Sequence, residues 1–177
     1  KKILNKKLIT CLVIPEGINQ ECLNLLNFSI KCLKQQENIK FIWRFHPITN
    51  IGKILNLMKL KINTLNKNIQ ISKEKSLNKD IMKSQFVLYR GSSVVVEAVK
   101  NGTIPLYLNY RENINIDPLK SCINKNNYIN TVNDFFSRVD FYKKNNFNIK
   151  KLSFNMLKNF NNEMNKKNIF KSLRINE

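Results

Sequence analysis

What this 177-residue sequence lacks limits the classes of protein to which it can belong. It has no run of about 18 or more apolar residues, so no transmembrane helix is expected. It has no internal repeat and no Gly/Ser-rich or Pro-rich linker, so we expect a single domain over 1–177 with a sizeable core. It opens on Lys1-Lys2-Ile3 without a methionine or a signal-peptide pattern, and we expect this end to continue a longer polypeptide.

Side chains for metal binding or nucleophilic catalysis are also scarce. The chain has one histidine, and Asp80 and Asp117 have no carboxylate nearby at ligand spacing. The cysteines lack C-x-x-C spacing, and three of the four fall inside apolar periodic segments, which favours core thiols in a reducing cytoplasm. We therefore predict no metal site, no resident cofactor and no nucleophile–base pair. The four cysteines are Cys11, Cys22, Cys32 and Cys122.

Acidic residues are few, since 12 Asp and Glu stand against 31 Lys and Arg and leave a net charge of +19. Such a charge first suggests a nucleic-acid partner. The lysines are spread along the whole chain, however, no aromatic stripe runs among them, and no nucleic-acid-binding motif is present. We expect no nucleic-acid partner, and contact with an anionic membrane surface stays open as an alternative.

Short apolar runs alternate with segments of helical spacing over a core at 8–110. The runs predict strands at 8–14, 40–45 and 69–72, and two more between Phe86 and Leu108. The spacing predicts helices at 18–36, 51–65, 77–83 and 131–143, and a helical C-terminal part that extends to 172. Asn50 and Thr131 are expected to cap two of these helices. This order predicts an α/β fold, a Rossmann-like parallel sheet of about five or six strands flanked by helices.

The stretch from Phe86 to Leu108 carries the strongest functional signal. An apolar run ends at Arg90-Gly91-Ser92-Ser93, and a helical segment and a second apolar run follow. Backbone N–H groups at the start of a helix and two hydroxyls suit a phosphate. Glu97 lies one turn after Ser93, where it could accept hydrogen bonds from ribose hydroxyls. The alternatives are a plain serine cap, an Arg90–carboxylate ion pair and a Glu97–Lys pair.

Two further polar clusters follow predicted strands. Glu16-Gly17 follows the first strand, and Arg44-Phe45-His46-Pro47 follows the second. The carboxyl ends of parallel strands share one edge, so all three clusters should converge on one crevice. Gly17 permits a left-handed turn or a close backbone approach, whereas Glu16 could serve only to cap the next helix.

His46 is the candidate catalytic residue. A lone histidine is more often structural, but this one follows a strand and precedes Pro47, which disfavours helical geometry and fixes the direction of the loop. Its imidazole could donate to a departing phosphate oxygen. Arg44 either binds phosphate or pairs with a carboxylate. The predicted ligand-binding residues are Glu16, Gly17, Arg44, His46, Pro47, Arg90, Gly91, Ser92, Ser93 and Glu97.

Together these residues resemble the C-terminal, donor-binding domain of a GT-B glycosyltransferase. The small-residue turn, Glu97 and the later Gly102-Thr103-Ile104-Pro105 resemble the donor signature of that fold. His46-Pro47 and Ser92-Ser93 resemble the HP and Ser motifs of bacterial capsule polysaccharide enzymes, including polysialyltransferases and CDP-glycerol glycerophosphotransferases. The resemblance implies CMP- or CDP-activated donors, with His46, Ser92 and Ser93 at the donor phosphate and Glu97 at the ribose. It also implies an N-terminal acceptor domain, for which this chain has no room.

The leading hypothesis is the donor-nucleotide-binding half of a metal-independent glycosyltransferase of surface polysaccharide synthesis. It would transfer a sugar or a polyol phosphate from a CMP-, CDP- or UDP-activated donor. Its partners would be a nucleotide-sugar donor, a glycan or lipid-linked acceptor, and an acceptor domain or separate acceptor chain. Its place would be the cytoplasm or the inner face of the membrane. The alternative is a non-catalytic Rossmann-like module that docks to an anionic membrane or a partner protein. A sugar-nucleotide epimerase is less favoured, because its site needs converging carboxylates and a histidine that the sequence does not show.

Overall fold

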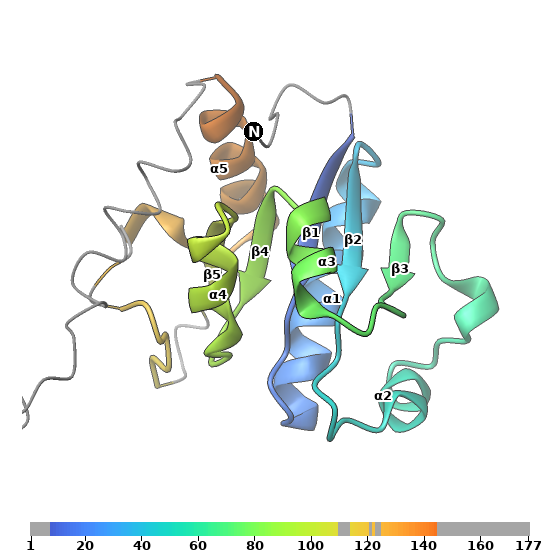
Figure 1. Cartoon of the computed structure of the whole chain (residues 1–177). Helices are drawn as coiled ribbons and strands as arrows, with labels where there is room; N and C mark the ends of the chain where they lie inside the picture. The colour runs from blue at the N-terminus through green and yellow to red at the C-terminus, as the bar shows by residue number, and fades with distance from the viewer. Residues whose placement is uncertain (1–7, 110–113, 121, 123–124, 145–177) are drawn as a thin grey trace, which may run out of the picture.

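In the computed structural model, the described residues (8–109, 114–120, 122 and 125–144) form a six-stranded, all-parallel sheet flanked by five helices (Figure 1). The order of the strands is β3-β2-β1-β4-β5-β6. The strands are β1 (Ile9–Val13), β2 (Ile39–Trp43), β3 (Ile69–Ile71), β4 (Phe86–Tyr89), β5 (Ile104–Leu108) and β6 (Tyr128–Ile129). The helices are α1 (Asn19–Gln35), α2 (Ile51–Leu57), α3 (Leu77–Lys83), α4 (Val94–Lys100) and α5 (Val132–Lys144), with 3-10 turns η1 (Ile62–Thr64) and η2 (Lys125–Asn127).

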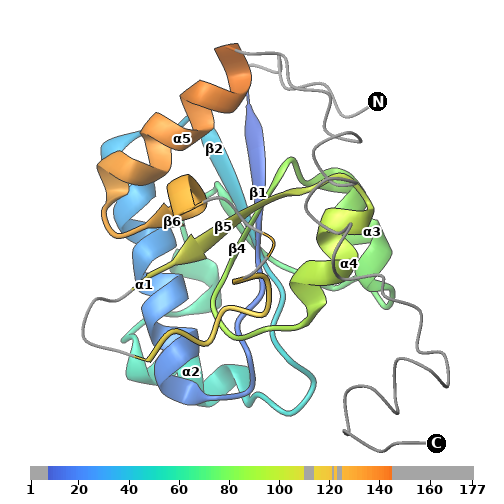
Figure 2. The same cartoon turned by 90° about the vertical axis from the view of Figure 1, so that its left-hand side faces the viewer.

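Helices cover both faces of the sheet, as the sequence predicts. Figure 2 shows α1, α2 and α5 on one side of the sheet and α3 and α4 on the other. Successive residues of a strand point to opposite faces, so Cys11 and Val13 of β1 pack with the α1 side, while Leu12 and Ile14 pack with the α3 and α4 side. A sheet covered in this way needs strands that are apolar on both faces, which explains their continuous apolar runs.

The α1 side of the core is tied together by aromatic contacts. The ring of Phe135 in α5 lies 6.0 Å, centroid to centroid, from both Phe28 in α1 and Phe41 in β2. Trp43, at the end of β2, is fully buried, and its Nε1 donates a hydrogen bond of 2.9 Å to the Ser29 hydroxyl of α1. These contacts fix β2 and α1 against each other, just below the loop that carries His46.

Two local predictions about helix ends are confirmed. The Asn50 side chain accepts a hydrogen bond of 2.9 Å from the Lys53 N–H at the start of α2. The Thr131 hydroxyl accepts one of 3.1 Å from the Asp134 N–H at the start of α5. The cysteines at 11, 22 and 32 are core thiols, as expected. The helices predicted beyond residue 148 lie outside the described residues.

The predicted helix over 51–65 is wrong in length. Helix α2 ends at Leu57, Lys59 has a left-handed φ of 54°, and η1 follows. Leu57 and Ile62, two apolar residues at the helical spacing, are 54% and 67% exposed. Beyond Leu57 the side chains that reach the core are the half-buried Met58, Leu60 and Leu65, so packing of an irregular segment replaces that of a continued helix.

The strand order places the candidate residues. The order reverses between β1 and β4, and in an open α/β sheet a ligand crevice forms beyond the carboxyl ends at this point. Strand β1 pairs with β2 on one side and with β4 on the other. The loops after β2, β1 and β4 therefore lie next to one another along one edge of the sheet.

Candidate functional site

The loop after β1 meets the loop after β2 at Gly17 and His46. A Cβ atom on Gly17 would lie 2.6 Å from Ile48 Cγ2 and 3.6 Å from His46 Nδ1. The first distance is shorter than a van der Waals contact allows, so a side chain at residue 17 would displace the turn that holds His46. Glycine at this position permits the close approach of the two loops.

The His46 ring is oriented by its own turn. Its Nδ1 accepts a hydrogen bond of 3.3 Å from the Ile48 N–H, and its carbonyl accepts one of 2.9 Å from the Thr49 N–H. An Nδ1 that accepts a hydrogen bond places the proton of the neutral imidazole on Nε2. The side chain is exposed, so His46 presents an N–H donor at the edge of the sheet.

The loop after β4 meets the loop after β1 at Gly91 and Glu16. A Cβ atom on Gly91 would lie 2.4 Å from Glu16 Oε1 and 2.6 Å from Oε2, so the carboxylate rests directly on the glycine. Glu16 Oε1 is buried, and no described residue forms a hydrogen bond with it. Gly17, the residue after Glu16, contacts the His46 loop after β2, so the loops after β1, β2 and β4 are linked by contacts.

Arg90 is buried in an ion pair with Glu21. The guanidinium is only 2% exposed, and its Nε lies 2.9 Å from Glu21 Oε2 in the first turn of α1. Burial raises the pKa of Glu21 above its usual value, and the charge of Glu16 adds to this, while Arg90 opposes it. The contact supports the ion-pair alternative for Arg90. No sequence pattern indicates Glu21 as the partner, because it lies 69 residues away along the chain.

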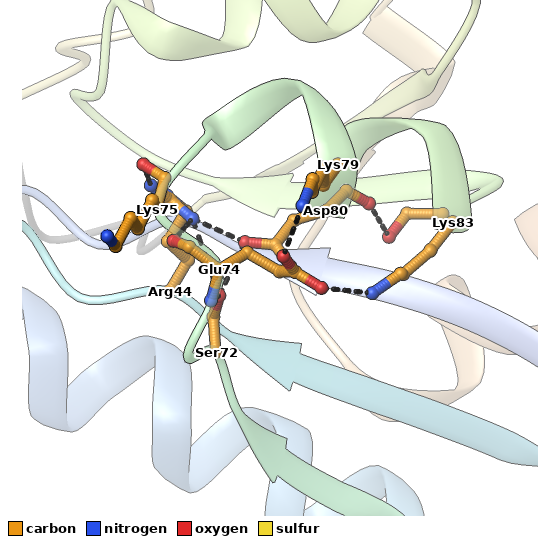
Figure 3. A network of polar contacts seen from close by, with 8 residues as sticks. Arg44, Ser72, Glu74, Lys75, Lys79, Asp80 and Lys83 are labelled. Carbon is orange, nitrogen blue, oxygen red and sulfur yellow. Dashed lines mark hydrogen bonds and ion pairs between the residues drawn. The ribbon is translucent and has the colours of Figure 1, made fainter.

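Arg44 is held by the β3–α3 segment rather than by the crevice loops (Figure 3). Its Nη1 donates to Asp80 Oδ2 at 2.5 Å and to the Glu74 carbonyl at 3.0 Å, and its Nη2 donates to the Lys75 carbonyl at 3.4 Å. Asp80, which is 1% exposed, also accepts a hydrogen bond of 2.6 Å from Ser72. These contacts support the ion-pair alternative for Arg44 and give Asp80 as its partner.

The polar groups of the turn before α4 are less engaged. Ser93 is the N-cap of α4 but makes no capping bond through its side chain. Among the described residues, none accepts a hydrogen bond from the backbone N–H groups of Gly91, Ser92 and Ser93. Glu97 Oε1 accepts a hydrogen bond of 2.8 Å from the Asn101 side chain, one turn further along α4, and not from a lysine. The plain-cap and Glu97–Lys alternatives therefore do not describe this turn.

A row of tyrosines lies beside Arg90, and sequence reasoning missed it. Tyr89, Tyr107 and Tyr128 are in register across β4, β5 and β6, with ring centroids 5.6 and 4.8 Å apart. The Tyr89 hydroxyl donates a hydrogen bond of 2.8 Å to Asp117 Oδ1, and burial raises the pKa of Asp117. Tyr89, Tyr107 and Asp117 are buried, and Tyr128 is half-buried. No local sequence pattern marks the row, because it depends on the register of the three strands.

The structure thus gathers most of the predicted residues at one edge of the sheet. It brings Glu16, Gly17, His46 and Gly91 into direct contact and places Pro47, Ser92 and Ser93 in the same loops. The described part of the chain holds no group of three or more side chains that could bind a metal ion. Within that part, no helix has the length and apolar character needed to cross a bilayer.

Comparison with known proteins gives the fold but no family. No protein-family model and no curated protein sequence matches the chain. Among solved structures, it is similar to the catalytic domain of cholesterol-alpha-glucosyltransferase from Helicobacter pylori, with 11% identity over 85% of this chain and 97% of that domain and a TM-score of 0.53. It is also similar to the C-terminal domain of LpcC, a glycosyl transferase group 1 family protein from Francisella tularensis, with 12% identity over 89% and 87% and a TM-score of 0.53. This is the fold of a GT-B C-terminal domain.

The same fold occurs in sugar-nucleotide epimerases. UDP-GlcNAc 2-epimerase from Neisseria meningitidis, in complex with UDP-GlcNAc, matches with 16% identity over 98% of this chain and a TM-score of 0.50. The chain spans only 46% of that protein's length. Identities this low establish the architecture alone, which the transferases and the epimerase share.

Proposed function

We propose that the crevice between β1 and β4 binds the phosphate of a nucleotide-activated sugar, as the donor half of a glycosyltransferase of surface polysaccharide synthesis. The observation that carries the proposal is the meeting of three loops at two glycines. Gly17 lies against the His46 turn, and Gly91 lies against Glu16. The likeness to glycosyltransferase domains supports the reaction class, and the epimerase bound to UDP-GlcNAc supports a nucleotide-sugar ligand.

The chemistry of such a site is stabilisation of the leaving nucleotide. Three kinds of group are hydrogen-bond donors for phosphate oxygens: the Nε2–H of His46, the two serine hydroxyls, and the N–H groups from Gly91 to Ser93, for which no described residue is an acceptor. The free oxygen of Glu97 is left for ribose hydroxyls. Arg44 and Arg90, which are engaged in ion pairs, would hold the loops in position instead of touching the donor.

The proposal assigns only the donor side to this chain. The donor would carry CMP, CDP or UDP, and a glycan or lipid-linked acceptor would be bound by a further domain or a separate chain. The chain alone should therefore bind the donor nucleotide but transfer its sugar poorly.

Titration calorimetry with CMP, CDP and UDP tests the proposal. We expect one of them to bind, and His46→Ala to weaken that binding, because a phosphate donor is lost. The control is Gln36→Ala, an exposed residue at the end of α1 that precedes β2 at the opposite edge of the sheet. No binding up to millimolar nucleotide would count against the proposal. Salt-sensitive sedimentation with anionic liposomes that survives His46→Ala would then favour the membrane-docking alternative.

An epimerase is a second candidate, because one observation favours it. The sequence shows no converging carboxylates, yet in the fold the charge of Glu16 acts on Glu21, which is paired with Arg90. The His46 turn lies against Gly17, the residue after Glu16. Epimerisation needs no acceptor. Proton NMR of a UDP-GlcNAc solution with the chain would show a second sugar isomer under this hypothesis and an unchanged sugar under the transferase proposal.

A further inference from the structure

We infer that the Glu16 carboxylate opposes phosphate binding at the turn that begins with Gly91, so that an uncharged side chain at residue 16 tightens the binding of phosphate-bearing ligands. This inference rests on the proposed function, and it adds a residue that sets the affinity of the site. It reverses the role expected for Glu16, which the sequence placed among the donor-binding residues.

The carboxylate lies against the first residue of the turn. A Cβ atom on Gly91 would meet Glu16 Oε1, Oε2 and Cδ at 2.4, 2.6 and 2.7 Å, so the whole carboxylate group covers that side of the glycine. The N–H groups of Gly91, Ser92 and Ser93, which have no acceptor among the described residues, belong to the same turn. A phosphate that approaches these N–H groups therefore comes close to the Glu16 carboxylate.

Among the described residues, none forms an ion pair with this carboxylate. Glu16 Oε1 is buried without a hydrogen-bond partner among the described residues. Arg90, the residue before Gly91, has its Nε 2.9 Å from Glu21 Oε2, in an ion pair with that residue. Burial raises the pKa of Glu21, and the charge of Glu16 adds to this rise. A phosphate bound at the turn would add another negative charge beside the partly buried Glu16 carboxylate, where like charges repel more strongly than in bulk water.

If Glu16 instead bound the ligand directly, replacing it would weaken binding rather than tighten it. If Glu16 accepted hydrogen bonds from hydroxyl groups of the ligand, its removal would leave those hydroxyls unpaired and weaken binding. Because the carboxylate lies on the phosphate turn itself, the repulsive role follows from the geometry.

Calorimetry with CMP and with inorganic pyrophosphate separates these roles. The proteins are the wild-type chain, Glu16→Gln, Glu16→Ala and the control Glu37→Gln. Glu37 is an exposed carboxylate paired with exposed Lys67, so its amide changes the net charge by the same amount away from the crevice. We expect both Glu16 variants to bind at least about tenfold more tightly than wild type, and Glu37→Gln to bind as wild type does.

Each outcome decides the inference. Tighter binding by both Glu16 variants, including binding where wild type shows none, supports it. Equal or weaker binding by these variants, with a wild type that binds CMP, overturns it and leaves the proposed function intact. A matching gain in Glu37→Gln also overturns it, since the effect would then be one of net charge. No binding by any of the four proteins overturns both this inference and the proposed function.

Discussion

Replacing Asp80 with asparagine should destabilise the fold, because it removes the charge that holds Arg44. Asp80 is 1% exposed and accepts hydrogen bonds from both Arg44 and Ser72. Removing one partner of a buried ion pair costs roughly 3–5 kcal/mol. Arg44 is 22% exposed and keeps its bond to the Glu74 carbonyl, so we expect the lower end, about 3 kcal/mol. For a chain of this size that is roughly 6–12 °C in Tm.

Urea unfolding followed by tryptophan fluorescence is the assay. Trp43 is the single tryptophan, is fully buried, and directly precedes Arg44, so its emission reports on this part of the fold. The control is Glu74→Gln, which removes only surface pairs with Lys79 and Lys83 and should leave the unfolding midpoint unchanged. If Asp80→Asn unfolds at the same urea concentration as wild type, the Arg44–Asp80 pair does not stabilise the fold and the reasoning fails.

Three further predictions concern single residues. Gly17→Ala should weaken nucleotide binding, measured by calorimetry, because its methyl group would displace Ile48 and with it the His46 turn. The urea midpoint should stay nearly unchanged, since Ile48 is exposed. An unchanged affinity would contradict the claim that the close contact of Gly17 with this turn positions His46. Asn50→Ala should lower the free energy of unfolding by about 1 kcal/mol through loss of the α2 cap, and a midpoint equal to wild type would refute this. Burial raises the pKa of Asp117, so the folded chain binds a proton at higher pH than the unfolded chain. Acidification from pH 7 toward about pH 4, near the unfolded pKa, should therefore stabilise wild type relative to Asp117→Asn. Urea midpoints at the two pH values measure the difference, and parallel pH dependence in both proteins would disprove it.

The sheet could be predicted because its information is local. Each of the first five strands is a short apolar run closed by a turn, and α3 is found over the predicted residues 77–83. Strand β6 has two residues and exists through its pairing with β5, so no local pattern marks it. The predicted length of α2 is wrong for a related reason. Apolar spacing supports a helix only where those apolar residues pack against a core, and Leu57 and Ile62 are exposed.

In the candidate site too, local signals located some residues, whereas the partners that depend on the fold could not be predicted. Strand ends and glycines located Gly17, His46 and Gly91, because the carboxyl ends of parallel strands share one edge. The partners of the charged residues could not be found, because pairs such as Arg90 with Glu21 join elements that only the folded sheet brings together. For each arginine, the sequence therefore leaves two roles open, phosphate binding and an ion pair with a carboxylate.

The central claim is that the loops after β1, β2 and β4 form one phosphate site, and NMR tests it most directly. His46 is the only histidine, so its ring signals need no assignment by mutation, and the Gly91 amide reports on the other loop. On titration with CMP or UDP, we predict that both signals shift along one saturation curve with a single Kd. Nucleotide binding that leaves both signals in place, or no shift of either at millimolar nucleotide, would contradict the account.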